Sequence, residues 1–125
     1  MAKKNSTLKI YRLLLTLTYM LTIIVGSMMN LKNSSKFKFV NLDKAIHFLV
    51  YSVFCLLVFD TIKQYNFKEE LKIAILFTIA FGIVIEFFQY LFTINRKFEL
   101  LDIFANILGI ITMAVIINLS KKNKK

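Results

Sequence analysis

Four long apolar segments, separated by short polar connections, limit what this chain can fold into. The segments span residues 8–29, 44–62, 71–94 and 100–119. Each has the roughly 17–25 residues that an α-helix needs to cross a bilayer core about 30 Å thick. Hydrophobic residues make up 58% of the 125, whereas roughly 45–50% is typical of a soluble domain. We therefore predict an all-α integral membrane bundle of four transmembrane helices, with residues 1–125 forming one domain.

The same distribution argues against other classes of protein. Apolar blocks of this length fit neither a soluble enzyme nor a disordered basic tail. The single cysteine, Cys55, has no second cysteine to pair with, which excludes a disulfide-stapled secreted domain. Segment 8–29 has a basic start like that of a signal peptide, but its apolar stretch exceeds the 7–15 residues of a typical signal-peptide core. We expect it to remain as an uncleaved transmembrane helix.

The basic residues at the segment ends predict an orientation. A chain with four spans has both tails and the connection at residues 63–70 on one side of the membrane. That side carries eleven of the 17 Lys and Arg residues, and the opposite side carries six. The positive-inside rule therefore predicts that both tails are cytoplasmic. The lysines between residues 121 and 125 fit an anchor on anionic lipid, and no aromatic–basic motif accompanies them, so we expect no nucleic-acid partner.

Polar residues inside the apolar segments share helical faces. They recur at spacings of three or four residues: Asp43, His47 and Tyr51 in the second segment, Glu86 and Gln89 in the third, and Asp102 and Asn106 in the fourth. In the predicted orientation all of them lie toward the outer surface, where we expect the three faces to meet. An unpaired carboxylate at membrane depth costs at least about 2.5–3.5 kcal/mol, so Glu86 needs a partner. The candidates are Arg96, His47 and a proton on Glu86 itself.

These residues also have purely structural interpretations. A histidine on an apolar helix is often only hydrogen-bonded, and an aspartate in the first turn of a helix is favoured by the helix dipole. Arg96 fits an anchor at the membrane rim as well as a salt bridge to Glu86 or Asp102. Gly82 and Gly109 are small enough to let helices approach closely, whether or not a pocket lies between them. The sequence leaves these alternatives open.

The order of the polar residues resembles a known family. The matching elements are Asp43-Lys44-Ala-Ile-His47-Phe-Leu-Val-Tyr51, Gly82-Ile-Val-Ile-Glu86-Phe-Phe-Gln89, Arg96, and Asp102-Ile-Phe-Ala-Asn106-Ile-Leu-Gly109. In this order, over residues 43–109, they resemble the VanZ-like family. The resemblance implies a small multi-pass protein of the bacterial cytoplasmic membrane and cell envelope, in a family associated with low-level resistance to the glycopeptide teicoplanin. Many members carry a proline or glycine near the turn before the arginine, where this chain has Thr93-Ile94-Asn95.

Together these features predict a polar pocket in the outer leaflet that binds a head group. The expected partners are membrane lipids and a lipid-linked envelope precursor, with Lys44, His47 and Arg96 donating to phosphate or carboxylate. The expected ligand-binding residues are Asp43, Lys44, His47, Tyr51, Glu86, Gln89, Arg96, Asp102 and Asn106. One alternative is a membrane enzyme acting on a lipid-linked substrate, with His47, Glu86 and Asp102 as the catalytic candidates. The other is a purely structural bundle, and the sequence leaves both catalysis and oligomeric state open.

Some of the same residues are of types that bind metal ions. His47, Glu86 and Asp102 are suitable ligand types, but the chain contains no HxxxH, HExxH or CxxC spacing. No glycine-rich loop of the kind that cradles phosphates is present either. We therefore expect no metal site and no cofactor.

Overall fold

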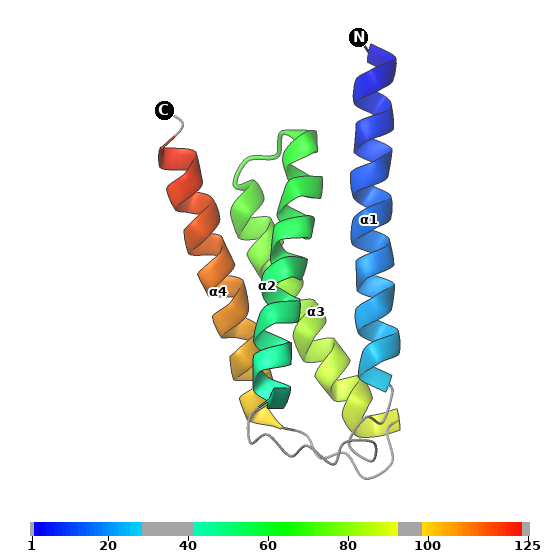
Figure 1. Ribbon diagram of the computed structural model, residues 1–125, viewed down its shortest axis with the longest axis vertical. Coiled ribbons are helices and arrows are strands. Elements are labelled where there is room, and N and C mark those ends of the chain that lie inside the picture. The colour runs from blue at the N-terminus through cyan, green and yellow to red at the C-terminus, as the bar shows by residue number, and fades with distance from the viewer. Residues whose placement is uncertain (1, 29–41, 93–98, 124–125) are drawn as a thin grey trace.

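The computed structural model describes residues 2–28, 42–92 and 99–123, with side chains from residue 6 onward. Its four α-helices are α1 (Ala2–Met28), α2 (Leu42–Ile62), α3 (Glu70–Phe92) and α4 (Leu100–Lys122), and a short 3₁₀ turn, η2 (Lys63–Tyr65), follows α2 (Figure 1). All four α-helices are long and apolar enough to cross a membrane. The predicted all-α bundle of four membrane-spanning helices is confirmed.

Two helices extend at least three residues beyond the predicted spans. Helix α1 begins at Ala2 and not at residue 8, and α4 continues to Lys122 and not only to residue 119. The predicted limits followed apolar composition, whereas alanine and lysine are good helix formers in water as well. Lysines in the last turn of α4 also face the negative end of the helix dipole. A helix can therefore continue past the part of it that is apolar.

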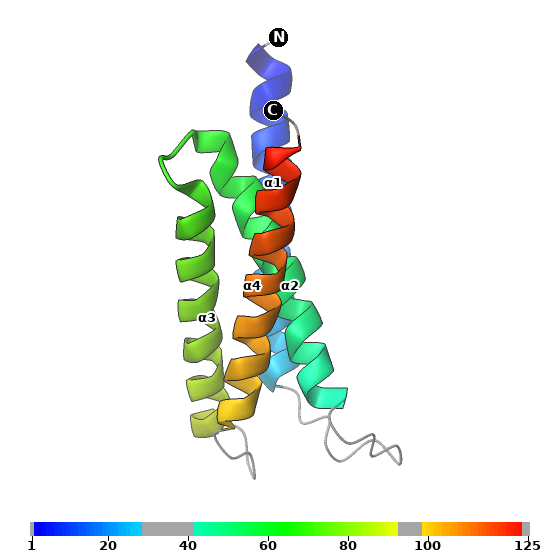
Figure 2. The same cartoon turned by 90° about the vertical axis from the view of Figure 1, so that its left-hand side faces the viewer.

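Helix α1 begins and α4 ends toward the same end of the bundle, as both views show (Figures 1 and 2). The connection between α2 and α3 lies at that same end. The opposite end holds the starts of α2 and α4 and the end of α3 (Figure 2). Helices α2 and α4 form the most extensive contact. Helix α1 is the least enclosed, with 11% of its span buried against 28–39% for the others.

The centre of the bundle is apolar and tightly packed. Phe54, Cys55 and Ile110 are fully buried there. A Cβ atom added to Gly109 would collide with the carbonyl oxygen of Phe48, and the Ser52 hydroxyl donates to the Gly109 carbonyl at 3.0 Å. The predicted close approach of helices at this glycine is confirmed between α2 and α4.

The exterior of the bundle is also apolar. Large side chains such as Leu14, Phe77, Phe92 and Leu101 are exposed on its surface. A water-soluble bundle would place charged and polar groups there. The arrangement is that of a multi-pass membrane protein, whose outer surface meets lipid.

A polar cluster near the chain termini attaches α1 to α2. The Arg12 guanidinium lies 3.2 Å from the Asp60 carboxylate, and the Thr16 and Thr61 hydroxyls are 2.8 Å apart. Asp60 lies near the end of the apolar helix α2. Its pairing with Arg12 gives it a structural role at the end of the bundle where the chain termini lie.

Candidate functional site

The polar residues singled out in the sequence gather at the end of the bundle away from the chain termini. Among them, the side chains with the least exposed surface come from all three helices α2, α3 and α4: Tyr51, Glu86, Gln89, Asp102 and Asn106 are each at most 3% exposed. Burying a polar group costs free energy unless the group is paired, so five such side chains in one place are not expected from packing alone. Arg96, which the sequence also predicted for the site, lies outside the described residues.

Lys44 is the hub of the charged part of this cluster. Its ammonium nitrogen lies 2.9 Å from a Glu99 carboxylate oxygen and 3.0 Å from Asp102 Oδ1. It is also 3.7 Å from Asp43 Oδ2. An ammonium has three hydrogens to donate, and these protein carboxylates are placed to accept them. Lys44, which the sequence predicted as a donor to a ligand's phosphate, is therefore engaged by the protein itself. Lys44 therefore holds α2 to the start of α4.

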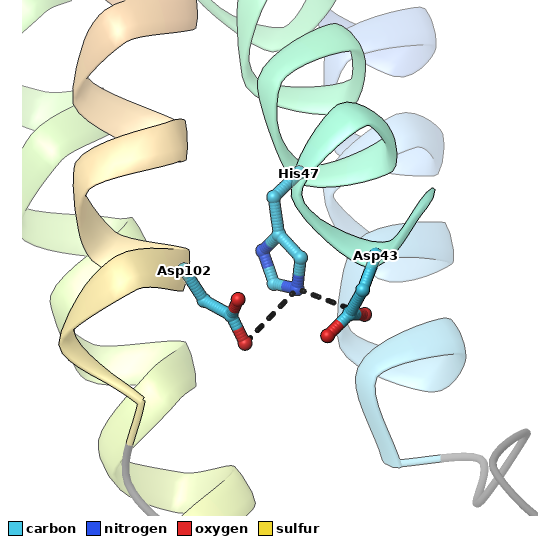
Figure 3. Close-up of side chains that lie close together, drawn as sticks. All are labelled: Asp43, His47 and Asp102. Carbon is cyan, nitrogen blue, oxygen red and sulfur yellow. Dashed lines mark ion pairs between the residues drawn. The ribbon is translucent and has the colours of Figure 1, made fainter. Parts of the chain in front are cut away.

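His47 is held between two helices. Its Nδ1 lies 3.0 Å from the amide oxygen of Asn106, whereas its Nε2 lies 3.8 Å from Asp102 Oδ2 and 4.0 Å from Asp43 Oδ1. Figure 3 shows the ring with one nitrogen directed between the two carboxylates. Because an amide oxygen only accepts hydrogen bonds, the proton of the 3.0 Å contact belongs to His47 Nδ1.

Three buried polar atoms have no hydrogen-bond partner among the described residues. They are the Tyr51 hydroxyl, the Gln89 carbonyl oxygen and Asp102 Oδ2. The other groups on two of these residues are satisfied, because Gln89 donates from Nε2 to the Ser27 carbonyl at 3.2 Å and Asp102 Oδ1 accepts from Lys44. Leaving a buried polar group unpaired costs about 1–3 kcal/mol, so each of these atoms calls for an explanation.

Glycine shapes the deeper part of the cluster. A Cβ atom added to Gly82 would lie only 2.9 Å from the Tyr51 ring and 3.4 Å from the Asn106 amide nitrogen. The absence of a side chain therefore lets α2 and α4 bring these two residues against α3. Glu86, one turn further along α3, accepts from the Glu99 backbone N–H at 3.4 Å.

Glu99 is a member of the cluster that the sequence analysis left out of the site. Its carboxylate lies 2.9 Å from the Lys44 ammonium. One signal was available, because Glu99 precedes Asp102 by three residues at the start of a helix, where two acidic residues share a face. That spacing predicts that Glu99 and Asp102 share a face, but it does not predict that Lys44 of α2 lies opposite them.

The cluster combines groups suited to ligand binding and to proton transfer. Asp43, His47 and Asp102 each offer one ligand atom, and these three atoms lie within 4.8 Å of one another. His47 is oriented by Asn106, as an acid–base histidine is oriented by its partner. The three unpaired buried atoms supply one hydrogen-bond donor and two acceptors to whatever enters the site.

Comparison with known proteins identifies the family of the chain. A model of the VanZ/LLP1 family matches residues 2–121 of the chain. The match extends beyond the motif region at residues 43–109 and takes in α1, where the sequence carries none of the motif residues. No curated protein matched the chain, and no solved structure did.

Proposed function

This chain belongs to the VanZ/LLP1 family, and from that premise we propose that it binds the polar head group of an envelope lipid or lipid-linked precursor. In this proposal the protein lies in the bacterial cytoplasmic membrane with both tails inside. The polar cluster then faces the outer leaflet. The excess of basic residues at the tail end supports this orientation.

The observation that carries the proposal is the set of unpaired buried atoms. All three such atoms in the described part of the chain belong to predicted site residues, Tyr51, Gln89 and Asp102. Their positions on three different helices would let one bound group contact each helix of the core. A bound head group that donates to Gln89 Oε1 and accepts from the Tyr51 hydroxyl would offset the cost of leaving them unpaired.

The charge of the cluster narrows the class of head group. Within residues 42–92 and 99–123, three carboxylates, those of Asp43, Glu99 and Asp102, surround the ammonium of Lys44. An excess of carboxylates attracts hydrogen-bond donors and repels bare phosphate. We therefore propose a head group that carries hydroxyl or ammonium donors, such as glycerol, ethanolamine or an amino sugar.

Lipid competition tests this function. The purified protein would be exchanged, with EDTA present, into an equal mixture of phosphatidylethanolamine, phosphatidylglycerol and phosphatidic acid, and its retained lipid identified by native mass spectrometry. We expect phosphatidylethanolamine or phosphatidylglycerol to be retained over phosphatidic acid. Preference for phosphatidic acid, or retention in the proportions of the mixture, would overturn the proposal.

Tyr51→Phe provides the matching variant. It removes a hydroxyl that has no hydrogen-bond partner among the described residues, so the fold alone predicts no loss of stability. Loss of one hydrogen bond to the lipid, worth about 1 kcal/mol, should weaken retention of the lipid about fivefold. The control is Thr22→Val, since Thr22 is exposed and its hydroxyl donates to the Thr18 carbonyl of its own helix. Consumption of the retained lipid by the wild type would favour the enzyme alternative over simple binding.

A further inference from the structure

The outer part of the cluster contains a set of atoms that fits a metal ion. His47 Nε2 lies 3.8 Å from Asp102 Oδ2 and 4.0 Å from Asp43 Oδ1, and one ligand atom from each residue lies within 4.8 Å of the others. We propose that Asp43, His47 and Asp102 bind one divalent transition-metal ion, represented by Zn²⁺. This inference goes beyond the proposed function but uses the same Asp102 oxygen, so the lipid competition above is run with EDTA, in the absence of the ion.

The distances are close to those of one shared ion. Zn²⁺ binds nitrogen and oxygen ligands at about 2.0–2.2 Å in a tetrahedral arrangement, so two ligands of the same ion lie about 3.4 Å apart. The separations from His47 Nε2 are 3.8 and 4.0 Å, and the three ligand atoms all lie within 4.8 Å of one another. Side-chain rotations that move the ligand atoms about 1 Å closer together would complete the site.

The orientation of His47 supplies an independent indication. Because its Nδ1 donates to the Asn106 amide oxygen, the neutral ring carries its lone pair on Nε2. That lone pair faces two carboxylate oxygens, neither of which has a hydrogen to donate when ionised (Figure 3). Three acceptors turned toward one another repel unless a cation lies among them. A histidine that donates its other ring N–H to a fixed acceptor is also the usual arrangement around a bound metal.

Asp102 supplies a second indication. Its side chain is 1% exposed, yet Oδ2, the oxygen directed toward His47, has no hydrogen-bond partner among the described residues. Its Oδ1 is held by Lys44 at 3.0 Å. Lys44 thus fixes the carboxylate through one oxygen and leaves the other free for an ion, as outer partners of metal ligands do.

Charge is consistent with an ion of charge two. Among the described residues, three carboxylates, those of Asp43, Glu99 and Asp102, face the single ammonium of Lys44. With His47 neutral, this leaves two negative charges in excess. A divalent cation would neutralise them, and with only three protein ligands it would keep coordination positions open for water or substrate.

The sequence predicted no metal site because none of the familiar metal-ligand spacings occurs in it. Asp43 and His47 are four residues apart on α2, but the third ligand, Asp102, begins a different helix. Such a site has no spacing signature along the chain. It becomes visible only once the starts of α2 and α4 are placed side by side.

The single histidine makes the test direct. His47 is the only histidine in the chain, so ¹⁵N-histidine labelling of the tag-free protein in micelles gives signals from one imidazole. After removal of metal with EDTA, one equivalent of Zn²⁺ should shift the Nε2 resonance while Nδ1 stays protonated. A spectrum with both nitrogens protonated and unchanged by Zn²⁺ would overturn the proposal, because His47 would then be only an imidazolium ion pair.

Variants separate this site from adventitious binding. Competition with a zinc-binding dye should give one Zn²⁺ per chain, with affinity at least tenfold lower in Asp43→Asn and Asp102→Asn. Asp43 is 39% exposed, so its variant is expected to fold even if Asp102→Asn does not. The control is Asp60→Asn, which removes a carboxylate at the opposite end of the bundle. Equal affinity in Asp43→Asn, Asp60→Asn and the wild type would show adventitious binding only and overturn the proposal. None of these outcomes depends on lipid retention, so the two proposals fail separately.

Discussion

Lys44 is the residue on which the acidic end of the bundle depends. It stands within 3.0 Å of two carboxylates, and one of them, Asp102, is 1% exposed. A buried carboxylate without a counterion is far more costly than the same group in water. The Lys44–Asp102 pair therefore stabilises the folded protein whether or not a ligand is bound.

We predict that Lys44→Met destabilises the protein and that a second substitution relieves the effect. Loss of hydrogen bonds to charged groups should lower the free energy of unfolding by about 2 kcal/mol. Adding Asp102→Asn removes the carboxylate charge that Lys44→Met leaves unpaired, and should recover at least half of the lost stability. A double-mutant cycle in detergent measures this interaction energy between the two positions. The control is Lys72→Met, because Lys72 and its partner Glu69 are both mostly exposed and should change stability by less than about 1 kcal/mol. Additive effects of the two site substitutions would contradict this role for Lys44.

Spacing predicted which residues turn inward but not which of them pair. Helical periodicity fixes the face on which Glu86, Gln89 and Asn106 lie, and all three are buried. Pairing across helices depends on the rotation and depth of each helix, which no local pattern encodes. That is why the contact of Lys44 with Glu99, 55 residues away along the chain, was missed.

At the scale of whole helices, apolar length predicted the number of elements, and small residues decide how two of them pack. The segments 44–62 and 71–94 correspond to α2 and α3, with changes of two residues or fewer at the ends. The close contact of α2 with α4 depends on a backbone approach at Gly109. The sequence indicated such an approach without indicating its partner, since the facing residue, Phe48, is fixed only by the packed structure.

We predict that Gly109→Ala weakens this contact, although alanine favours the helix itself. The new methyl group would meet the Phe48 carbonyl, which belongs to a helix backbone and cannot rotate away. Overpacking typically costs about 1–3 kcal/mol. The control is Gly26→Ala, because a Cβ at Gly26 meets nothing within 4 Å and the substitution should stabilise α1 by up to about 1 kcal/mol. Thermal unfolding in detergent should move in opposite directions for the two variants, and a shared direction would contradict the packing assigned to Gly109.

The two ends of the molecule along its long axis differ in the polar groups that they carry. One end carries the two chain termini and the Arg12–Asp60 pair, and the other carries the buried polar cluster around His47 (Figure 1). Between them the interior is apolar, centred on Phe54 and Ile110. The assignment of the cluster to the outer leaflet therefore depends on which end faces the cytoplasm.

We predict that the orientation follows the count of basic residues. A reporter fused after Lys125 should be cytoplasmic in the wild type, where eleven basic residues flank the tail side and six flank the other. Replacing Lys3, Lys4, Lys124 and Lys125 with alanine leaves seven against six while preserving the Lys121–Glu70 pair, so the reporter should divide between the two sides. The matched control replaces Lys32, Lys36, Lys38 and Lys97, which changes the same number of charges but raises the bias to eleven against two. A wild-type reporter found outside would reverse the orientation and place the cluster on the cytoplasmic side of the membrane.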